Sequence, residues 1–201
     1  MDFDIAKMRG THVCLELLSP DHRETIRPLA KNELIWEFNK MLPVDENYEA
    51  AYDTYFDGAL DKTALSGQQA FVIRALQGNS IIGMTRLYEI NLKEKTVLIG
   101  YTWYIPSVWG KVHNKECKLL LLQYIFEALK FNRAELRVAH QNIRSQKAVE
   151  KIGAVKEGVL RKHGYRNDGS IRHTVVYSII DDEWPQAKEK LLSLIIENKN
   201  V

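Results

Sequence analysis

The stretch of sequence that decides the fold is residues 109–158, WGKVHNKECKLLLLQYIFEALKFNRAELRVAHQNIRSQKAVEKIGAVKEG. Its pattern predicts a loop, a long helix, a short strand and a short helix, in that order. The run VLIGYTWYI at residues 97–105 precedes it and is rich in β-branched and aromatic residues, so a strand leads into this stretch. One face of the long helix is apolar, at Leu119, Leu122, Phe126 and Leu129.

The turn between that strand and the long helix is a candidate anion site. Pro106 ends the strand because it lacks the N–H that a sheet ladder needs, and Asn114 is the expected N-cap of the helix. First-turn N–H groups have no partner inside a helix and lie at its positive end, so they suit a phosphate or pyrophosphate. On these residues alone, an ordinary solvated helix start is the favoured explanation of the pattern. Three lysines add positive charge: Lys111, Lys115 and Lys118.

The second half of the stretch contains the most specific motif. Residues 136–139 are a short apolar strand, and Asn142 opens a helix that Gly153 ends. The pattern G-K-x-x-N-K-E begins at Gly110, N-x-x-S-x-x-A-x-x-x-I-G-A covers residues 142–154, and E-G-V-L-R covers 157–161. Together these residues resemble the GNAT N-acetyltransferase superfamily, and most closely the branch of ribosomal-protein N-terminal (alanine/serine) acetyltransferases. The resemblance extends over nearly the whole chain and favours the pyrophosphate interpretation of the turn.

The rest of the chain supplies the other strands and helices. Strand patterns occupy residues 12–18, 70–76 and 81–89, and helical patterns occupy 21–32, 48–60 and the segment after Asp182. A hairpin with Gly169 in its loop joins strands at 157–165 and 171–180, in a register that places His163 opposite His173 and Arg161 opposite Val175. The strand at 136–139 follows a helical crossover, so we expect it to lie parallel to the strand at 97–105.

These elements predict an α/β (α+β) fold: a mixed, mostly antiparallel sheet of about seven strands with helices on both faces. It is the acyl-CoA N-acyltransferase type that the resemblance implies. Nothing in the composition divides residues 1–201, so one GNAT-like domain is expected. Two parallel strands that diverge at their carboxyl ends form a crevice, where ligands of α/β sheets prefer to bind.

Charge and cysteine content limit the functional classes. A formal net charge of +2 gives no strong field for a nucleic acid, and no apolar run is long enough for a membrane span. Cys14 and Cys117 have no disulfide or metal spacing and are expected to be packing residues in a reducing compartment. We therefore expect a cytoplasmic protein with neither a nucleic-acid nor a membrane partner, and a homodimer is left open.

The resemblance implies that acetyl-CoA is the cosubstrate, with no metal. Backbone amides of Trp103, Tyr104 and Ile105 would lie beside the pantetheine and polarise the thioester carbonyl, which gives Tyr104 a catalytic role. Val112 stands where the family usually has glycine, so it restricts the backbone there. The expected phosphate loop consists of Trp109, Gly110, Lys111, Val112, His113, Asn114 and Lys115.

The same resemblance assigns Asn142 and Ser145 to the pantetheine arm and the thiol, although helix capping alone would also explain both residues. Ala148 replaces the tyrosine that many members use as the general acid, so Ser145, directly or through a water, is the candidate acid. Glu89 is the nearest candidate base, and the alternatives are His140, His163 and His173. His163 and His173 lack a third ligand at useful spacing, so zinc is rejected.

The predicted activity is transfer of acetyl from acetyl-CoA to a primary amine, which could be a protein N-terminus. We expect Trp36 and Phe38 to wall the acceptor pocket rather than the core, with His163 and His173 also near the acceptor. Three alternatives remain: a small-molecule acceptor such as a polyamine, amino acid or aminoglycoside; a non-catalytic acyl-CoA-binding or regulatory module; and an ATP-dependent transferase, which lacks a Walker pattern.

Overall fold

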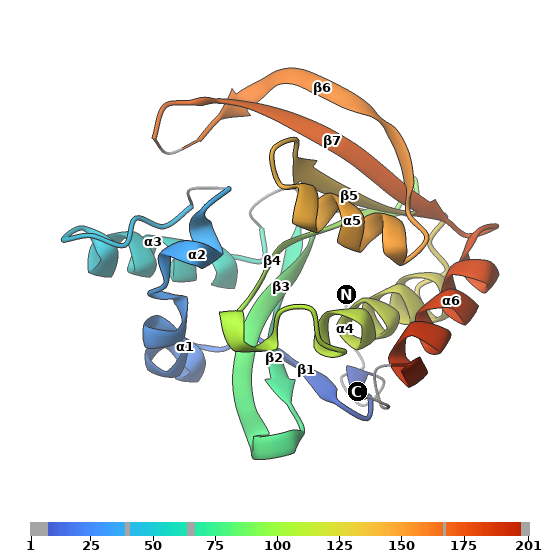
Figure 1. The fold of residues 1–201 in the computed structure, drawn as a ribbon, viewed down its shortest axis with the longest axis horizontal. Helices are drawn as coiled ribbons and strands as arrows, with labels where there is room; N and C mark the ends of the chain where they lie inside the picture. Colours follow the sequence, from blue (N-terminus) through green and yellow to red (C-terminus); the bar gives the residue numbers. More distant parts are fainter. Residues whose placement is uncertain (1–7, 39–40, 64–66, 167, 198–201) are drawn as a thin grey trace.

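The computed structural model describes residues 8–38, 41–63, 67–166 and 168–197. A seven-stranded sheet runs through these residues in the order β1-β2-β3-β4-β5-β7-β6 (Figure 1). Neighbouring strands are antiparallel except β4 and β5, which are parallel, as expected from the helical crossover between them. The strands are β1 Val13–Leu17, β2 Gln68–Ala75, β3 Ser80–Asn91, β4 Thr96–Tyr104, β5 Arg133–Ala139, β6 Val155–Tyr165 and β7 Ile171–Ile180.

Helices cover both faces of the sheet, which confirms the predicted fold class (Figure 1). They are α1 Arg23–Ala30, α2 Glu33–Trp36, α3 Tyr48–Leu60, α4 His113–Gln123, α5 Ile143–Lys151 and α6 Trp184–Glu197. A π-helical turn, Tyr124–Ala128, extends α4, and short 3-10 turns lie at Pro20–His22, Gln77–Asn79 and Pro106–Val108. Within the described residues, no helix is both long and apolar enough to span a membrane.

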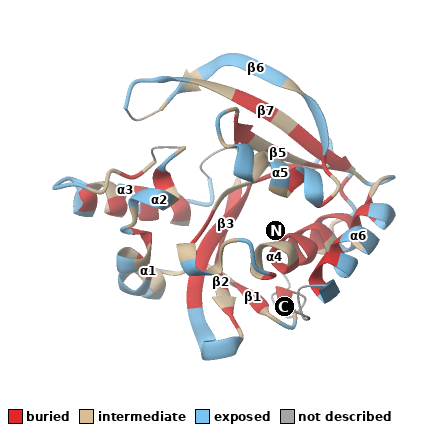
Figure 2. Ribbon diagram, viewed as in Figure 1, coloured by how far each residue is buried: buried red, intermediate tan, exposed pale blue. Residues whose placement is uncertain are grey.

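Two hydrophobic clusters lie on opposite faces of the sheet. Successive side chains of a strand point to opposite faces, so Val72 packs with α1–α3 while its neighbour Ile73 packs with α4 and α6. Both helix layers bury their sheet-facing sides (Figure 2). We call the sheet face that packs against α4 and α6 the α4 face, and the sheet face that packs against α1–α3 the α3 face. Cys14 and Cys117 are buried thiols, as expected.

The predicted hairpin register is correct only near its turn. Tyr165 pairs with Ile171, but an irregularity between Leu160 and Gly164 shifts the rest, so Val159 rather than Arg161 lies opposite Val175. Lys162, inside this irregularity, has a φ of 49°, the left-handed conformation typical of a bulge. Between the pairs Gly164–Arg172 and Leu160–Thr174, β6 has two more residues than β7, and the predicted pairing of His163 with His173 is not formed.

Two further bulges distort β3 and β4. Register shifts fall between Met84 and Arg86 and between Tyr88 and Asn91 of β3. Tyr101 of β4 has a φ of 51° and Glu89 of β3 a φ of 48°, both unusual for residues other than glycine. Such bulges commonly redirect side chains near functional sites, and both lie beside the point where β4 and β5 separate.

Candidate active site

The gap between β4 and β5 is the central feature of the site. The two strands pair at Thr96–Arg133, Val97–Ala134 and Leu98–Glu135 only. Beyond these pairs, β4 continues to Tyr104 and β5 to Ala139, each hydrogen-bonded only to its other neighbour. The facing edges of the two strands are therefore unpaired beyond Leu98 and Glu135, as expected for parallel strands that diverge at their carboxyl ends.

Of the three amides expected to contact the thioester, one faces this gap. The amide of Ile105 donates to the carbonyl of Ile82, 2.9 Å away, on β3. Residues of an antiparallel pair alternate between bonding their partner and pointing away from it, so Trp103 also bonds toward β3, opposite Met84. Tyr104 then directs its N–H into the gap. The prediction is corrected for Trp103 and Ile105, whose amides β3 occupies, and the Tyr104 amide remains the candidate donor.

The predicted phosphate loop is built around a left-handed glycine. Gly110 has a φ of 77° and turns the chain from the Pro106–Val108 turn into α4. The helix begins at His113 with Val112 at its N-cap, so Asn114 lies inside the first turn and is not the predicted cap. The amide of Lys111 donates to the Val108 carbonyl, 3.3 Å away. Within the described chain, no backbone acceptor bonds the amides of Gly110, Val112, His113, Asn114 or Lys115.

Val112 does not obstruct this loop. Its side chain is 8% exposed and packs into the cluster on the α4 face. The isopropyl group therefore points under the helix, away from the free amides, and the loop obtains its turn from Gly110 instead. Lys111 is exposed and Lys115 is partly exposed, so both can supply positive charge at the helix start. Burial, followed by repulsion from Lys151, lowers the pKa of Lys115.

Trp109 links the end of β4 to the start of α5, which follows β5. Its indole Nε1 donates to the carbonyl of Tyr104 at 2.9 Å, and the guanidinium of Arg144, in the first turn of α5, lies 3.8 Å from the centre of its ring. Arg144 was not predicted, although it lies inside the N-x-x-S motif. It adds a cation to the Lys111 and Lys115 side of the crevice.

The start of α5 is held by a side-chain cap. Asn142 Oδ1 accepts a hydrogen bond of 3.0 Å from the amide of Ser145, so the capping interpretation of Asn142 is correct. The Ser145 hydroxyl is partly exposed and makes no hydrogen bond to any described residue. No described residue therefore competes with a ligand for this hydroxyl.

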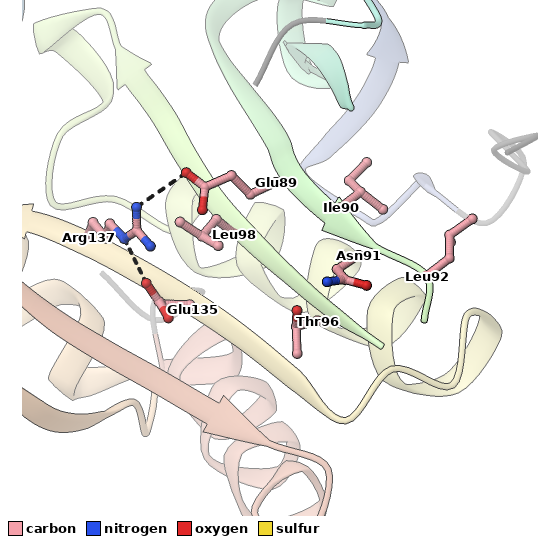
Figure 3. Close-up of a pocket in the computed structure, with 8 residues that line it drawn as sticks. All are labelled: Glu89, Ile90, Asn91, Leu92, Thr96, Leu98, Glu135 and Arg137. Atoms are coloured by element: carbon pink, nitrogen blue, oxygen red, sulfur yellow. Dashed lines mark hydrogen bonds and ion pairs between the residues drawn. The ribbon is translucent and has the colours of Figure 1, made fainter. Parts of the chain in front are cut away.

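The α3 face of the strands that form the gap carries a row of charged side chains. Arg137 of β5 contacts Glu89 Oε1 at 3.3 Å and Glu135 Oε1 at 2.7 Å (Figure 3). With Leu98 and Thr96 these residues line an open pocket of about 760 Å³. Glu89, the predicted base, thus lies on the face opposite α4 and is held by Arg137.

The predicted histidines do not form one site. His163 Nδ1 lies 3.1 Å from the Thr174 hydroxyl, whereas the His173 ring packs edge-on against His140, 4.8 Å between centres. His173 Nδ1 accepts from the amide of Lys162. Among the described residues, no group of three potential metal ligands comes together, so no metal site was found there.

The expectation that Trp36 lies outside the core is wrong. Trp36 is 2% exposed, donates from Nε1 to the Ala30 carbonyl at 2.7 Å, and packs against the rings of Tyr55 and Trp103. Trp36 contacts one ring from α3 and one from β4, so this residue of a connecting segment is part of the core. Phe38 is partly exposed, and its carbonyl accepts from Arg166 Nε at 3.1 Å.

Two buried polar side chains were not predicted as site residues. Lys118 is 5% exposed and donates to Thr102 Oγ1 at 3.0 Å, beneath β4. Burial lowers the pKa of its amine. Arg86 is 4% exposed and stacks on Tyr101, the bulge residue, 4.4 Å from the ring centre. A charged residue among apolar neighbours, as in the run CKLLLL for Lys118, was the available signal.

Comparison with known proteins identifies this arrangement. Residues 12–155 match the family model described as "Acetyltransferase (GNAT) domain". The "Putative ribosomal N-acetyltransferase YdaF" of Bacillus subtilis (strain 168) is 30% identical over 184 residues, covering 88% of this chain and 96% of that protein. These names favour an enzyme over the non-catalytic module.

Solved structures share the fold. One described as a "putative acetyltransferase" from T. thermophilus superposes with a TM-score of 0.82 at 32% identity, covering 94% of this chain and 96% of that one. Spermidine N-acetyltransferase from Vibrio cholerae, solved with CoA and spermine, has a TM-score of 0.69 at 21% identity, covering 88% and 99%, and supports the fold alone. GNAT acetyltransferases use acetyl-CoA, and the gap, the loop and the family match together show that this chain is a GNAT N-acetyltransferase.

Proposed function

We propose that this N-acetyltransferase transfers acetyl from acetyl-CoA to a primary amine that enters the gap from the α3 face. The observation that carries the proposal is the early end of the β4–β5 pairing after Leu98–Glu135, beside a helix start whose amides are free. Pyrophosphate would bind the amides of Gly110 and residues 112–115, with charge from Lys111, Lys115 and Arg144. The pantetheine would then follow the unpaired edge of β4 toward Tyr104.

In this proposal the Tyr104 amide donates to the thioester oxygen, which gains negative charge as the amine attacks the carbonyl carbon. The phenol of Tyr104 is not a proton donor, because its ring lies in the core on the α4 face and burial raises its pKa. Positioning supplies most of the rate in such a reaction, since fixing two reactants lowers a barrier by roughly 7–11 kcal/mol.

Proton transfers fall to residues on the two sides of the gap. Glu89 is the proposed base, directly or through water, because it lies on the α3 face beside the pocket. The CoA thiolate leaves on the other side, where Ser145 or a water that it holds supplies the proton. A thiol is far more acidic than a serine hydroxyl, so the water relay is the easier route.

The test is release of free CoA thiol across a panel of amines, N-terminal peptides, polyamines and aminoglycosides. Turnover with at least one primary amine supports the proposal. CoA binding without turnover on any member would instead favour the acyl-CoA-binding module. A protein N-terminus is the proposed acceptor class on the strength of the similarity to YdaF, and a small-molecule amine is the second candidate.

We also propose that the enzyme is a single domain, that it is cytoplasmic and that it forms a homodimer. The sheet continues from β5 into β7 and β6, beyond the family match, which supports one domain over residues 1–201. The buried thiols of Cys14 and Cys117 fit a reducing, cytoplasmic compartment. Exposed apolar side chains on the edge strand β6, at Val155, Val159 and Leu160, support a homodimer.

A further inference from the structure

Beside the gap, on the α3 face, lies a cluster of four side chains that the proposed mechanism does not use. Arg86 and Tyr88 come from β3, Tyr101 from the bulge of β4, and Arg172 from β7. Leu87, between Arg86 and Tyr88, packs on the α4 face, and so does Val175, three residues from Arg172 on β7. Alternation along the strands therefore directs Arg86, Tyr88 and Arg172 to the α3 face. We call these four residues the arginine–tyrosine cluster.

The rings of the cluster are fixed by close packing. Tyr88 and Tyr101 meet edge-on with 5.1 Å between ring centres, and Arg86 lies over Tyr101. The Tyr88 ring also lies against Gly100, where an added Cβ would come within 2.7 Å of it. Burial raises the pKa of both phenols above the usual range, so each hydroxyl stays protonated and can donate.

The two arginines have no carboxylate partner among the described residues. Arg86 makes long contacts only, to Gln68 Oε1 at 3.4 Å and to the Tyr55 carbonyl at 3.5 Å, and its buried Nε has no partner. The Arg172 side chain makes no hydrogen bond or ion pair with any described residue, and its Nε is buried. Nearby Arg137, by contrast, is neutralised by Glu89 and Glu135.

An unpaired guanidinium in a partly buried place is costly to keep. Burial lowers the pKa of Arg172, and repulsion from Arg166 and Arg137 acts in the same direction, while Tyr88 and Tyr101 oppose it. Arginine still remains charged near neutral pH. The cluster thus combines an uncompensated positive charge with two phenol donors, on the face from which the acceptor amine would approach.

We propose that the acceptor carries an anionic group, a carboxylate or a phosphate, that binds Arg172 and the hydroxyls of Tyr88 and Tyr101 while its amine enters the gap. Arg86 holds Tyr101 in place. The inference rests on the proposed function, because it assumes that the amine enters from the α3 face. An acceptor such as spermidine, which carries only positive charge, would be repelled by this cluster.

The experiment uses the whole protein and pairs of acceptors that differ by one anion. Ser-Glu and Ser-Gln peptides, glucosamine 6-phosphate and glucosamine, and glutamate and glutamine test the three sources of an anion, with spermidine as the cationic acceptor. We expect the anionic member of at least one pair to have a kcat/KM about 10- to 100-fold higher, the usual range for a charged hydrogen bond. Arg172→Gln should remove that preference and leave KM for acetyl-CoA unchanged.

Arg161→Gln is the matched control, because Arg161 is an exposed arginine on β6. A second readout does not need turnover: glutarate or inorganic phosphate should raise the thermal midpoint of the wild type and of Arg161→Gln, but not of Arg172→Gln. Equal use of both members of every pair, or a preference for spermidine, with no anion-dependent midpoint shift overturns the inference and leaves the proposed function standing. Failure of every amine, with the midpoint shift intact, removes the proposed function instead.

Discussion

The two sides of the β4–β5 gap are made in different ways. On the α4 side, the proposed donor site consists of backbone: the amide of Tyr104, the turn at Gly110 and the open first turn of α4. On the α3 side, the proposed acceptor site consists of side chains from β3, β4, β5 and β7, above all Arg86, Tyr101 and Arg172. A backbone site tolerates many side chains, whereas a side-chain site sets specificity. The donor should therefore be common to the family and the acceptor particular to this protein.

The largest expected effect tests whether the acceptor side is also part of the core. Trp36→Ala removes a side chain that is 2% exposed and that packs on Tyr55 and Trp103. We expect the free energy of unfolding to fall by about 3–5 kcal/mol, the usual cost of emptying such a site. Urea denaturation measures it, with Phe38→Ala as the partly exposed control. A loss below about 1 kcal/mol in Trp36→Ala would return this residue to a purely substrate-contacting role.

The second effect concerns proton delivery on the donor side. Ser145→Ala should lower kcat by roughly 10- to 10³-fold, because an acid or its water acts only as the thiolate develops. The amide of residue 145 still donates to Asn142 Oδ1 in this variant, so we expect the first turn of α5 to stay folded. Steady-state kcat and a separate Kd for CoA check the prediction. If kcat is unchanged, or falls only because CoA no longer binds, the proton comes from bulk water.

The two sides of the gap also differ in how much of each could be predicted from the sequence. The turns and helix ends of the proposed donor side could be predicted, because Gly110, Asn142 and Gly153 act locally, within a few residues. Arg86 and Arg172 are far apart in sequence and lie on one face of the sheet only through the strand order, and Tyr101 reaches Arg86 through a bulge that changes its direction. Trp36 was misjudged because burial in a connector depends on the helices that pack around it.

The third effect concerns the buried amine beneath β4. Lys118 is buried with one hydroxyl partner, and its pKa is lowered. At pH values between the pKa of Lys118 in the folded chain and its pKa in the unfolded chain, the unfolded chain binds more protons. The contribution of this residue to the free energy of unfolding therefore falls as the pH drops below about 10.5. Lys118→Met should therefore be more stable than the wild type by about 1–3 kcal/mol at pH 7, with a smaller difference at pH 10.

Urea denaturation of both proteins at the two pH values measures this difference, and Lys188→Met, at a lysine that pairs with Glu127 at the surface, is the control. An equal difference at pH 7 and pH 10 would mean that the Lys118 amine does not titrate in this range. A loss of stability at both would mean that its bond to Thr102 outweighs the cost of burial.

The smallest effect tests how far the donor side depends on side chains. Lys111 is exposed beside the free amides, so its attraction to a phosphate is screened by water and salt. Lys111→Glu should weaken CoA binding by only about three- to fivefold, near the value of an exposed ion pair. Calorimetry with CoA and with pantetheine separates the contributions, since pantetheine has no pyrophosphate and should bind both proteins equally. If Lys111→Glu instead abolishes CoA binding, the lysine rather than the backbone carries the pyrophosphate, and the contrast between the two sides of the gap fails. If pantetheine binds as tightly as CoA in the wild type, residues 110–115 do not hold the pyrophosphate.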